Sequence, residues 1–402
     1  MKSFVEFFAG VGLVREGLRK SNWNCVWAND ISKDKQETYI ENFGSHDFWL
    51  GDIWDIAKDS TSVPDNSFLY TASFPCTDLS VAGGRAGLAG KESGTLNALI
   101  EILRNKRKSN TAPKVVLLEN VRGFLTSHQG KDVEKTVSYL SELGYFVDII
   151  ELDAIDFSAQ SRPRVFVIAV EEELARNSMK IKNGIQLFDH WWADFEKQPY
   201  LRSDKIKNII LNNESLNWAL FDVDLPPKSN IQLADIIETE IPEDSQLWWN
   251  NERKDHLFNQ MSEIHKSILN NMIDGQKYSY GTVYRRMRKG KSMAELRTDG
   301  YAGCLRTPRG GSSKQIVIRA GDHSWDVRLL TPREYARLQG VRDCFKLPDN
   351  ANKGYFAMGD AVCVPVIEFI SQNILDPLYL LSNVSNKVLP SKKNSAALQN
   401  WQ

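Results

Sequence analysis

The sequence predicts an α/β protein with a doubly wound, mostly parallel sheet in a first domain and an irregular second domain. Two observations support this fold class. Short apolar runs alternate with helical patterns over residues 1–170, and the alternation stops at about Glu171. With 402 residues, 42% of them hydrophobic, the chain is long enough for two or three domains with ordinary cores.

The chain begins with a buried strand over residues 4–8, a glycine turn and a helix that follows it directly. The turn is Ala9-Gly10-Val11-Gly12, and its glycines allow a tight bend and a close approach of a ligand to the backbone. A second strand over residues 25–28 leads to Asp30, which lies 20 residues after Gly10. At that spacing an acidic side chain can bind ribose hydroxyls, so a nucleotide-like ligand is predicted here.

The alternation continues through the rest of the first domain. A helix over residues 33–42 is followed by Gly51-Asp52-Ile53 at the end of a third short segment. Ligands of parallel sheets bind beyond the carboxyl ends of the strands, where Asp30, Cys76 and Glu119 are all expected. The remaining strands are predicted at residues 68–70, 115–118, 146–150 and 165–170, with helices such as 96–103 and 133–143 between them.

Cys76 follows Pro75 at the end of a predicted strand and precedes a glycine-rich segment, residues 83–90. Proline stiffens the turn and glycines let the next loop move, so this position suits a nucleophile. On this stretch alone, a buried structural cysteine is the more frequent outcome. The five cysteines are scattered and form no CxxC pair, which predicts neither a disulfide framework nor a metal site.

Residues 171–327 are predicted to form the second domain. One helix is expected there, from the helical period of Leu257, Met261, Ile264, Ile268 and Met272. Between residues 276 and 319, eleven basic residues accompany only two acidic ones, and four tyrosines interleave with them. A charge run is often only a solvated surface, but a chain of net charge −1 that concentrates positive charge in one stretch suits a polyanion.

The C-terminal part, residues 328–380, is predicted to return to the first domain. A helix begins near Pro332 and stops at Gly340, and a last apolar helix follows Gly359-Asp360. Residues 381–402 are predicted to be a disordered tail. No apolar run approaches the roughly 18 residues of a membrane span, and an acidic residue comes too early for a secretory signal, so a cytoplasmic (bacterial cytosol or nucleoid) location is expected.

Together, and in this order, the motifs resemble those of the DNA (cytosine-5) methyltransferases of bacterial restriction–modification systems. Residues 8–12 resemble the family's cofactor-binding turn, and Pro75-Cys76 resembles its nucleophile motif. The resemblance covers residues 1–170 and 328–375, implies the Rossmann-like fold of S-adenosylmethionine-dependent methyltransferases, and gives residues 171–327 the place of a target-recognition domain. The other matching motifs are Ser93-Gly94-Thr95-Leu96, Glu119-Asn120-Val121, Gln160-Ser161-Arg162-Pro163-Arg164, Leu330-Thr331-Pro332-Arg333-Glu334 and Gly359-Asp360-Ala361-Val362.

The resemblance implies a role for each of these site residues. Cys76 would add to C6 of a flipped-out cytosine, and Glu119 would bind the N3 and N4 edge of the base. Arg162 and Arg164 would hold the base or lower the pKa of the thiol. The cofactor would be S-adenosyl-L-methionine, and the residues implied to bind it are Phe8, Gly10, Gly12, Asp30, Ile31, Asp52, Ile53, Pro75 and Asp360.

Double-stranded DNA is the implied substrate, with a loop over residues 80–92 closing over the flipped base. Three positions depart from the family's pattern: Leu13, Thr77 and Asp360. A monomeric enzyme with a cognate restriction endonuclease that acts on the same site is a further expectation. The residues expected to contact DNA are Arg85, Arg285, Arg286, Arg288, Arg306 and Arg309.

Two other activities remain as alternatives. One branch of the same family methylates tRNA, but the Cys-Phe-Thr triplet that marks it is not found, since Cys344-Phe345 is followed by Lys346. A nicotinamide-dependent oxidoreductase would account for the glycine turn and Asp30. The chemistry of that class of enzyme does not require Pro75-Cys76, Glu119 and the paired arginines together, so it leaves these motifs unexplained.

Overall fold

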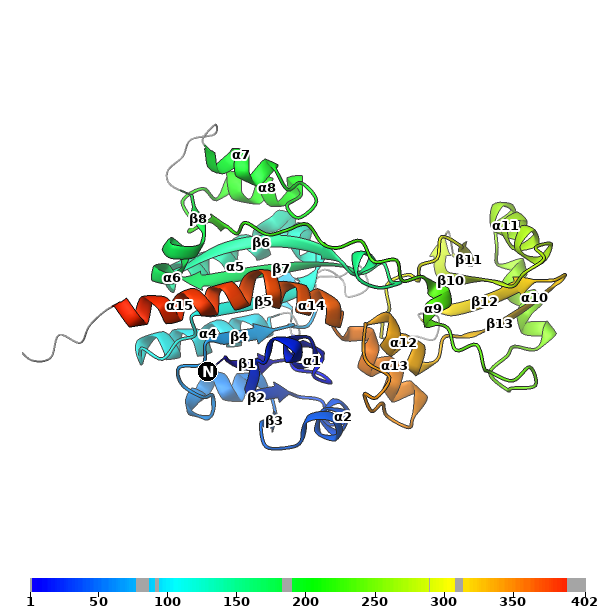
Figure 1. The fold of residues 1–402 in the computed structure, drawn as a ribbon, viewed down its shortest axis with the longest axis horizontal. Helices are drawn as coiled ribbons and strands as arrows, with labels where there is room; N and C mark the ends of the chain where they lie inside the picture. The colour runs from blue at the N-terminus through cyan, green and yellow to red at the C-terminus, as the bar shows by residue number, and fades with distance from the viewer. Residues whose placement is uncertain are drawn as a thin grey trace, which may run out of the picture.

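The computed structural model describes residues 2–76, 87–90, 94–182, 190–288, 290–307 and 314–388. Figure 1 shows a large lobe built around a seven-stranded sheet and a small lobe built around a four-stranded sheet. Helices α12 (Pro332–Leu338) and α13 (Ala351–Asp360) lie between the two lobes.

The large sheet has the strand order β3-β2-β1-β4-β5-β7-β6. Every neighbouring pair from β3 to β5 is parallel, which confirms the predicted doubly wound, mostly parallel fold. The chain's progress across the sheet reverses between β1 and β4, and ligands of such sheets bind in the crevice at that point. The strands are β1 (Ser3–Phe7), β2 (Asn24–Asp30), β3 (Phe48–Leu50), β4 (Leu69–Ala72), β5 (Val115–Val121), β6 (Tyr145–Asp153) and β7 (Pro163–Glu171).

Strand β7 is the exception, because it runs antiparallel to both β5 and β6. Only residues 154–162 join β6 to β7, which is too short for the crossover that a parallel connection needs. The antiparallel direction brings the start of β7 to the edge where β5 ends. Arg164 in β7 therefore lies opposite Val121, two residues from Glu119.

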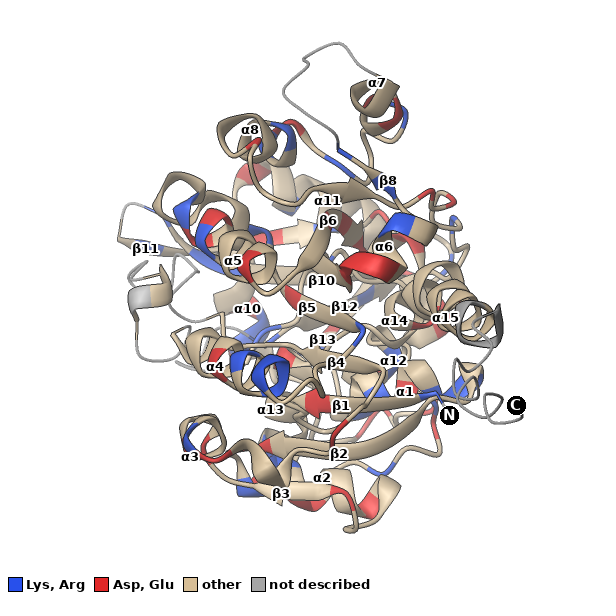
Figure 2. Ribbon diagram, turned by 90° about the vertical axis from the view of Figure 1, so that its left-hand side faces the viewer, with Lys and Arg blue, Asp and Glu red and all other residues tan. Residues whose placement is uncertain are grey.

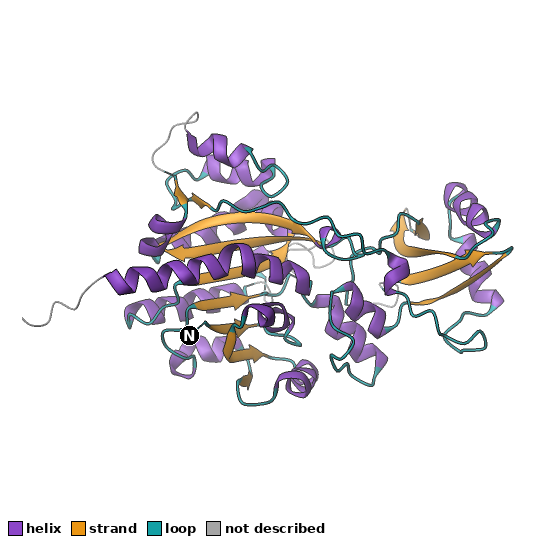
Figure 3. Cartoon of the chain, viewed as in Figure 1, coloured by secondary structure: helices purple, strands orange, loops and turns teal. Residues whose placement is uncertain are grey.

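Helices cover both faces of the large sheet (Figure 3). Helix α4 shows why: Leu96, Leu99 and Leu103 recur at helical spacing and are all buried. Helices α3, α4 and α5 share one apolar core, and α1, α6, α14 and α15 share the core of the opposite face. Their bounds are α1 (Leu13–Leu18), α2 (Lys33–Phe43), α3 (Ile53–Lys58), α4 (Thr95–Lys108), α5 (Lys131–Glu142), α6 (Glu172–Ser178), α14 (Val364–Ile370) and α15 (Asp376–Val388).

The segment after β7 packs on the large sheet. Trp191, Trp192 and Trp218 are buried in the core that α4 and α5 share. The sequence assigns residues 171–327 to the second domain. In the structure the described residues 172–182 and 190–221 pack on the large sheet, where the three tryptophans are buried. The elements are α6, β8 (Lys180–Ile181), α7 (His190–Glu196), α8 (Asp204–Asn212) and β9 (Ala219–Leu220).

The small lobe has a core of its own, with the antiparallel strand order β11-β10-β12-β13. The expected single helix over residues 257–272 is wrong. The carbonyl of Gln260 accepts from the amide of Ala294 at 3.0 Å, which breaks the helix, and Ile264 is 73% exposed. The elements are α9 (Leu233–Ile236), α10 (Asn251–Asn259), α11 (Glu263–Ile273), β10 (Ser279–Arg288), β11 (Lys291–Arg297), β12 (Ile316–Gly321) and β13 (Ser324–Leu329).

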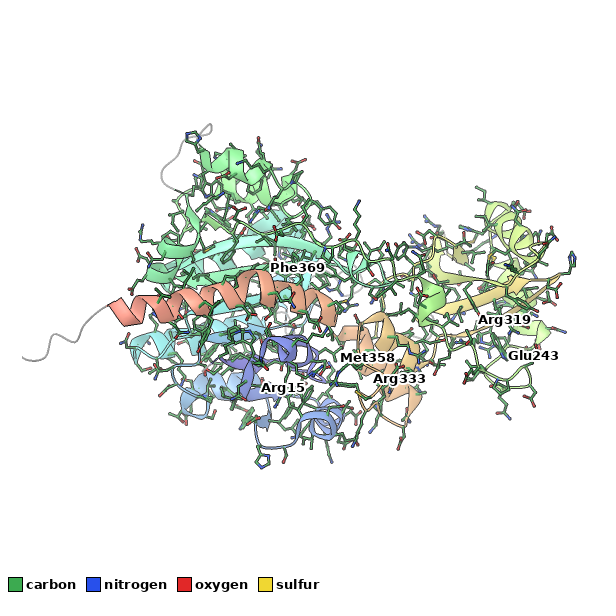
Figure 4. The ribbon with its side chains drawn as sticks, viewed as in Figure 1. Arg15, Glu243, Arg319, Arg333, Met358 and Phe369 are labelled. Carbon is green, nitrogen blue, oxygen red and sulfur yellow. The ribbon has the colours of Figure 1, made fainter. Side chains whose placement is uncertain are left out.

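The C-terminal helices return to the large sheet. Phe369 of α14 lies over that sheet (Figure 4) and packs against Phe157, with ring centroids 5.4 Å apart. Asp376 begins α15 and accepts hydrogen bonds from Lys2 and Trp23. Anchored in this way, α15 runs to Val388 and so enters the segment 381–402 that the sequence predicts to be disordered. Residues 389–402 lie outside the described residues.

The described part of the chain contains one helical stretch, Ala351–Val384, that is long and apolar enough to cross a membrane by length and composition alone. It comprises α13, α14 and most of α15. Because 72% of its most apolar window is buried inside the protein, we interpret these helices as core elements that pack on the sheet.

Replacing Asp148 tests the packing of residues 202–221 on β6. Asp148 accepts from Nε of Arg202 at 3.0 Å, and both side chains are buried. Asp148→Ala leaves a buried guanidinium without its counter-ion and is expected to lower the free energy of unfolding by about 3–5 kcal/mol, measured in urea. The double variant Asp148→Ala/Arg202→Met removes the charge as well and should recover part of that loss. An unchanged midpoint for the single variant would show that this pair does not hold the layer.

Candidate active site

Cys76 lies four residues beyond β4, at the carboxyl edge of the sheet. The turn before it is braced from β5, because Nδ2 of Asn120 donates to the carbonyl of Phe74 at 3.0 Å. The Phe74 ring is buried and meets Phe124 edge to face, with centroids 5.5 Å apart. Pro75 and Cys76 are half-buried. The thiol therefore stands on a fixed turn beside the point where the sheet order reverses.

Glu119 lies near the end of β5, and the start of β7 supplies its partner. Nε of Arg164 is 3.0 Å from Oε1 of Glu119, and Nη1 of Arg164 donates to the carbonyl of Pro163 at 2.9 Å. Glu119 is 8% exposed. A buried carboxylate needs a counter-ion, and the planar guanidinium also fixes its orientation.

Arg162, two residues earlier, is almost fully buried and binds other segments. Its Nη1 donates to Sγ of Cys304 at 3.4 Å and to the carbonyl of Leu305 at 2.9 Å. Its Nη2 donates to the carbonyls of Gly359 at 3.3 Å and Ala361 at 2.8 Å. Arg162 thus ties the segment before β12 to the end of α13, so its guanidinium serves the packing of these segments.

The thiol of Cys76 does not have the lowered pKa that the sequence suggests. Burial raises the pKa of Cys76, and this effect outweighs the opposing influence of Arg164 and the smaller influence of Arg162. Glu119 and Asp360 add to the rise. The free protein therefore holds this cysteine as a neutral thiol at neutral pH, because removal from water disfavours the thiolate more than the arginines favour it.

Cys304 is a second thiol at this place that sequence reasoning did not select. Burial acts to raise its pKa, but Arg162, Arg164 and Arg306 together outweigh burial and lower the pKa of Cys304 below its ordinary value. The only sequence signal was its position within the basic stretch of residues 276–319. The positive charge expected to act on Cys76 acts more strongly on this residue.

The glycine turn uses left-handed backbone conformations. Gly10 and Gly12 have φ of 57° and 85°, which favours glycine, and a Cβ at Gly12 would lie 2.5 Å from the ring of Phe43. Phe8 also has a positive φ, 54°. Leu13, where the family has glycine, is buried in the core and begins α1, so the turn closes without a third glycine.

Asp30 closes this turn from β2. Its Oδ2 accepts from the amide of Gly10 and its Oδ1 from the amide of Ser32, both at 2.8 Å. Each oxygen keeps a further lone pair, so the carboxylate remains able to accept from a ligand. The side chain of the next residue, Ile31, is 70% exposed, which is unusual for isoleucine and suits an apolar ring of a ligand.

Asp52 and Ile53 follow β3, at the start of α3. Asp52 caps α3, accepting from the amide of Trp54 at 3.0 Å. The side chain of Ile53 is 3% exposed and belongs to the core, so only its backbone faces the site. The Trp54 side chain is 42% exposed and, with Ile31, gives this edge a second apolar surface.

Asp360 ends α13 and lies on the opposite side of the turn. Its Oδ2 is 3.3 Å from Nζ of Lys35 in α2, and Lys35 in turn approaches Gly10, where a Cβ would be 4.0 Å from its Cδ. Asp360 also contributes to the rise in the pKa of Cys76. Asp360, one of the positions that depart from the resembled pattern, therefore joins α2 to α13 across the glycine turn and lies close to the thiol.

The residues expected to contact DNA differ in their surroundings. Arg286 and Arg288 both pair with Glu295 of β11, at 3.1 and 2.8 Å, and the guanidinium of Arg306 stacks on the Tyr284 ring at 5.0 Å. Arg285 points to the other face of β10 and has no ion pair among the described residues. Arg85, Arg309, Thr77 and most of the loop 80–92 lie outside the described residues. On the side of the large lobe that faces away from β10–β13, basic and acidic residues are mixed (Figure 2).

Glu6 is a further residue that sequence reasoning missed. It lies in β1, is 1% exposed, and neither of its oxygens completes a hydrogen bond with a described residue. Burial raises the pKa of Glu6 to about 8, against the opposing effect of Arg15. An acid inside the apolar run Phe4–Phe8 was the signal that could have found it.

Comparison with known proteins identifies relatives over nearly the whole chain. The family model for C-5 cytosine-specific DNA methylases matches residues 2–376. The chain is 30% identical to the Type II methyltransferase M.BanI of Aneurinibacillus aneurinilyticus, over 92% of this chain and 95% of that protein. It is 26% identical to the Type II methyltransferase M.HhaI of Haemophilus parahaemolyticus, over 92% of this chain and 93% of that protein.

Two solved structures share its fold along almost the full length. The Dnmt2 methyltransferase of S. pombe matches with a TM-score of 0.57 and 18% identity, over 94% of this chain and 99% of that chain. A putative DNA modification methyltransferase encoded within an E. coli prophage matches with a TM-score of 0.51 and 18% identity, over 96% and 100%. At these identities the likeness shows the fold alone.

The buried Glu6 predicts a pH dependence of stability. Because folding raises the pKa of Glu6, its contribution to the free energy of unfolding is complete below the pKa of the unfolded state, near 4.5. That contribution is lost as the pH rises toward about 8, the pKa of the folded state. Glu6→Gln removes the titration, so the stability of the variant relative to the parent should rise between pH 5 and 8 by a few kcal/mol at most, since a tenfold change in proton affinity corresponds to about 1.4 kcal/mol. Urea unfolding at several pH values measures this. The exposed Glu41→Gln should show no such trend, and a flat difference for Glu6→Gln would contradict the raised pKa.

Proposed function

The chain belongs to the C-5 cytosine-specific DNA methylase family, and from that premise we propose that it methylates C5 of a cytosine within a specific sequence of double-stranded DNA. The observation that carries the proposal is the convergence of Cys76, Glu119 and Arg164 at one edge of the sheet, next to the glycine turn. Its curated relatives are Type II methyltransferases, which supports a role in protecting DNA from a cognate restriction endonuclease, most simply as a cytosolic enzyme.

The proposed reaction follows from the low electron density of the aromatic cytosine ring, which makes C5 a poor nucleophile. Addition of the Cys76 thiolate to C6 breaks the aromaticity and leaves enamine-like electron density on C5, so one difficult step becomes two easier ones. Since burial holds Cys76 as a neutral thiol in the free protein, the thiol gives its proton to water as the base enters, and Arg164 is the cation that most favours the thiolate. After methyl transfer, water or hydroxide takes the C5 proton, and the electron pair of the C5–H bond re-forms the C5–C6 double bond and expels the Cys76 thiolate.

Glu119 is proposed to bind the N3 and N4 edge of the base. A proton shared between Glu119 and N3 lowers the barrier to addition, because it offsets the negative charge that develops on the ring. The same contact discriminates against thymine, which presents a carbonyl where cytosine has an amine. Arg164 acts as a positioning residue for Glu119, because its Nε lies 3.0 Å from the carboxylate.

S-adenosyl-L-methionine supplies the methyl group when bound, and the glycine turn fits such a ligand. The proposed partners are Phe8, Gly10 and Gly12 on one side, Asp30 for the ribose, and Ile31 with Asp52 for the adenine. The exposed apolar side chain of Ile31 and the remaining lone pairs of Asp30 support this assignment. Ile53 and Pro75 are proposed to contribute backbone atoms.

The target must leave the duplex to reach Cys76, at a cost of a few kcal/mol. The small lobe is proposed to hold the flanking DNA, with Arg306 among its contacts. The alternative of tRNA as substrate is not favoured, because the curated relatives are DNA methyltransferases and the Cys-Phe-Thr triplet is absent.

Replacing the thiol tests the proposal directly. Cys76→Ser is expected to lower the rate of methyl transfer by at least several orders of magnitude, because an alcohol is a far weaker nucleophile at neutral pH. Bisulfite sequencing of DNA from cells that produce each protein reports the base, its position and its context. The buried Cys363→Ser serves as the thiol control. Cytosine methylation by Cys76→Ser at the parent's rate would refute the covalent mechanism, and no methylated cytosine with the parent protein would refute the function.

Replacing Glu119 tests its role at the base. Glu119→Gln is expected to lower the single-turnover methylation rate by about 10²–10⁴-fold, the range for a positioned acid or base. Glu171→Gln is the matched control, since Glu171 lies at the other end of β7 from Arg164 and pairs with Lys114. A rate for Glu119→Gln within a factor of two of the control would remove Glu119 from the reaction.

A further inference from the structure

A cavity of about 360 Å³ lies between the small lobe and α13, outside the site described above. Its walls come from the start of α10 and the segment before it, from β10, from the segment before β12, from the end of β13 and from α13. The residues that line it are Trp249, Arg253, Arg285, Lys314, Leu329, Asn352 and Phe356. The proposed function assigns no ligand to any of them, and the sequence predicts only for Arg285 a general contact to DNA.

The cavity concentrates positive charge without a counter-ion. Among the described residues, Arg253, Arg285 and Lys314 line it and no carboxylate does, and none of the three forms an ion pair with a described carboxylate. Nε of Arg285 is buried and lacks a hydrogen-bond partner in the described structure. Burial, with a smaller repulsion from Arg253, lowers the pKa of Arg285. Arg253 is exposed, and Arg285 and Lys314 are half-buried, so water screens their mutual repulsion only in part, and a bound anion offsets what remains.

Aromatic and amide groups hold these cations in place. The guanidinium of Arg253 lies over the Trp249 ring at 4.2 Å. Nζ of Lys314 donates to Oδ1 of Asn352 at 2.7 Å and lies 4.5 Å from the centre of the Tyr355 ring. The positive groups are therefore positioned before any ligand arrives, which lowers the entropy that binding costs.

The cavity shares a helix face with the candidate active site. Asn352, Phe356 and Asp360 follow one another at intervals of four residues along α13 and so lie on one side of it. Asp360 is close enough to Cys76 to raise the pKa of its thiol. Eight residues of helix span about 12 Å, so the cavity lies a few nucleotide steps of about 3.4 Å from the position of the target base.

We propose that this cavity binds one backbone phosphate of the DNA, with its sugar against Phe356, a few nucleotides from the flipped cytosine. The volume exceeds that of a bare phosphate and lies within the range of ligand-sized pockets, and Phe356 offers an apolar wall that is 40% exposed. Contacts to backbone phosphates fix the position of the DNA without adding sequence specificity. The inference rests on the proposed function.

Neutralising the cavity tests the proposal. Arg253→Met/Arg285→Met keeps the bulk of both side chains and removes both charges. The double variant should bind a duplex that carries the methylated sequence roughly 10–100-fold more weakly. The slope of log affinity against log salt should become shallower by about one, because the protein then neutralises one phosphate fewer. Lys108→Met/Lys205→Met is the control of equal charge change, on exposed sites of α4 and α8, and should leave affinity and slope as in the parent.

A second experiment uses the parent protein and does not depend on the fold of a variant. Single phosphates along the duplex are replaced in turn by neutral methylphosphonates, and the affinity is measured each time. One position within a few nucleotides of the target cytosine should weaken binding to the parent by a similar factor. The same replacement should have little further effect on the double variant, because the two changes remove one interaction.

The outcomes separate this proposal from the proposed function. The proposal would be overturned if the double variant binds DNA more weakly but every methylphosphonate position lowers its affinity as much as it lowers the affinity of the parent. The proposal would also be overturned if millimolar inorganic phosphate, at constant ionic strength, stabilises the parent but not the double variant, while the methylphosphonate scan gives the same losses of affinity for both proteins. That result would assign the cavity to a free anion. If the parent neither binds nor methylates DNA, the proposed function fails first, whatever the cavity holds.

Discussion

The buried guanidinium of Arg162 is the interaction on which the arrangement of the two lobes at the candidate site depends. Its two terminal nitrogens donate to Cys304 and Leu305 before β12 and to the carbonyls of Gly359 and Ala361 at the end of α13. Gly359 has no room for a side chain, because a Cβ there would lie 2.6 Å from the backbone of Arg306. Neighbouring Gln160 binds Leu305 and Leu338 in the same way. A single short motif thus connects segments that are more than 140 residues distant in sequence.

Burial, more than charge, sets the protonation of the site in the free protein. Cys76 and Glu6 both have raised pKa values because they are removed from water, although Arg164 and Arg15 act in the opposite sense. Cys304 shows the reverse balance, since three arginines outweigh its burial. A thiol kept neutral until the substrate arrives is protected from adventitious reaction, because the thiolate is the reactive form.

The positive charge of the small lobe is less available than its composition suggests. Arg286 and Arg288 share Glu295, and Arg297 and Arg319 pair with Asp299 and Asp326. Such pairs fix side chains on a sheet surface and contribute little net attraction for a distant polyanion. Arg253 and Arg285, which have no such partner in the described structure, combine with Lys314 at one cavity, and this is where a phosphate gains most.

The sequence by itself determined the sheet, the glycine turn and the position of Cys76, because each depends on local patterns: apolar runs of strand length, glycines that take a positive φ, and a proline before the thiol. It also placed Asp30 and Glu119 at one edge, since parallel strands end together. Only the tertiary structure decided the partner of Glu119, because a short connection reverses β7 and brings Arg164 to that edge. It also decided that Trp191, Trp192 and Trp218 pack on the large sheet, that the predicted helix breaks at Gln260, and that burial outweighs charge at Cys76. Each of these outcomes depends on contacts between distant segments and on the exclusion of water, which no local pattern contains.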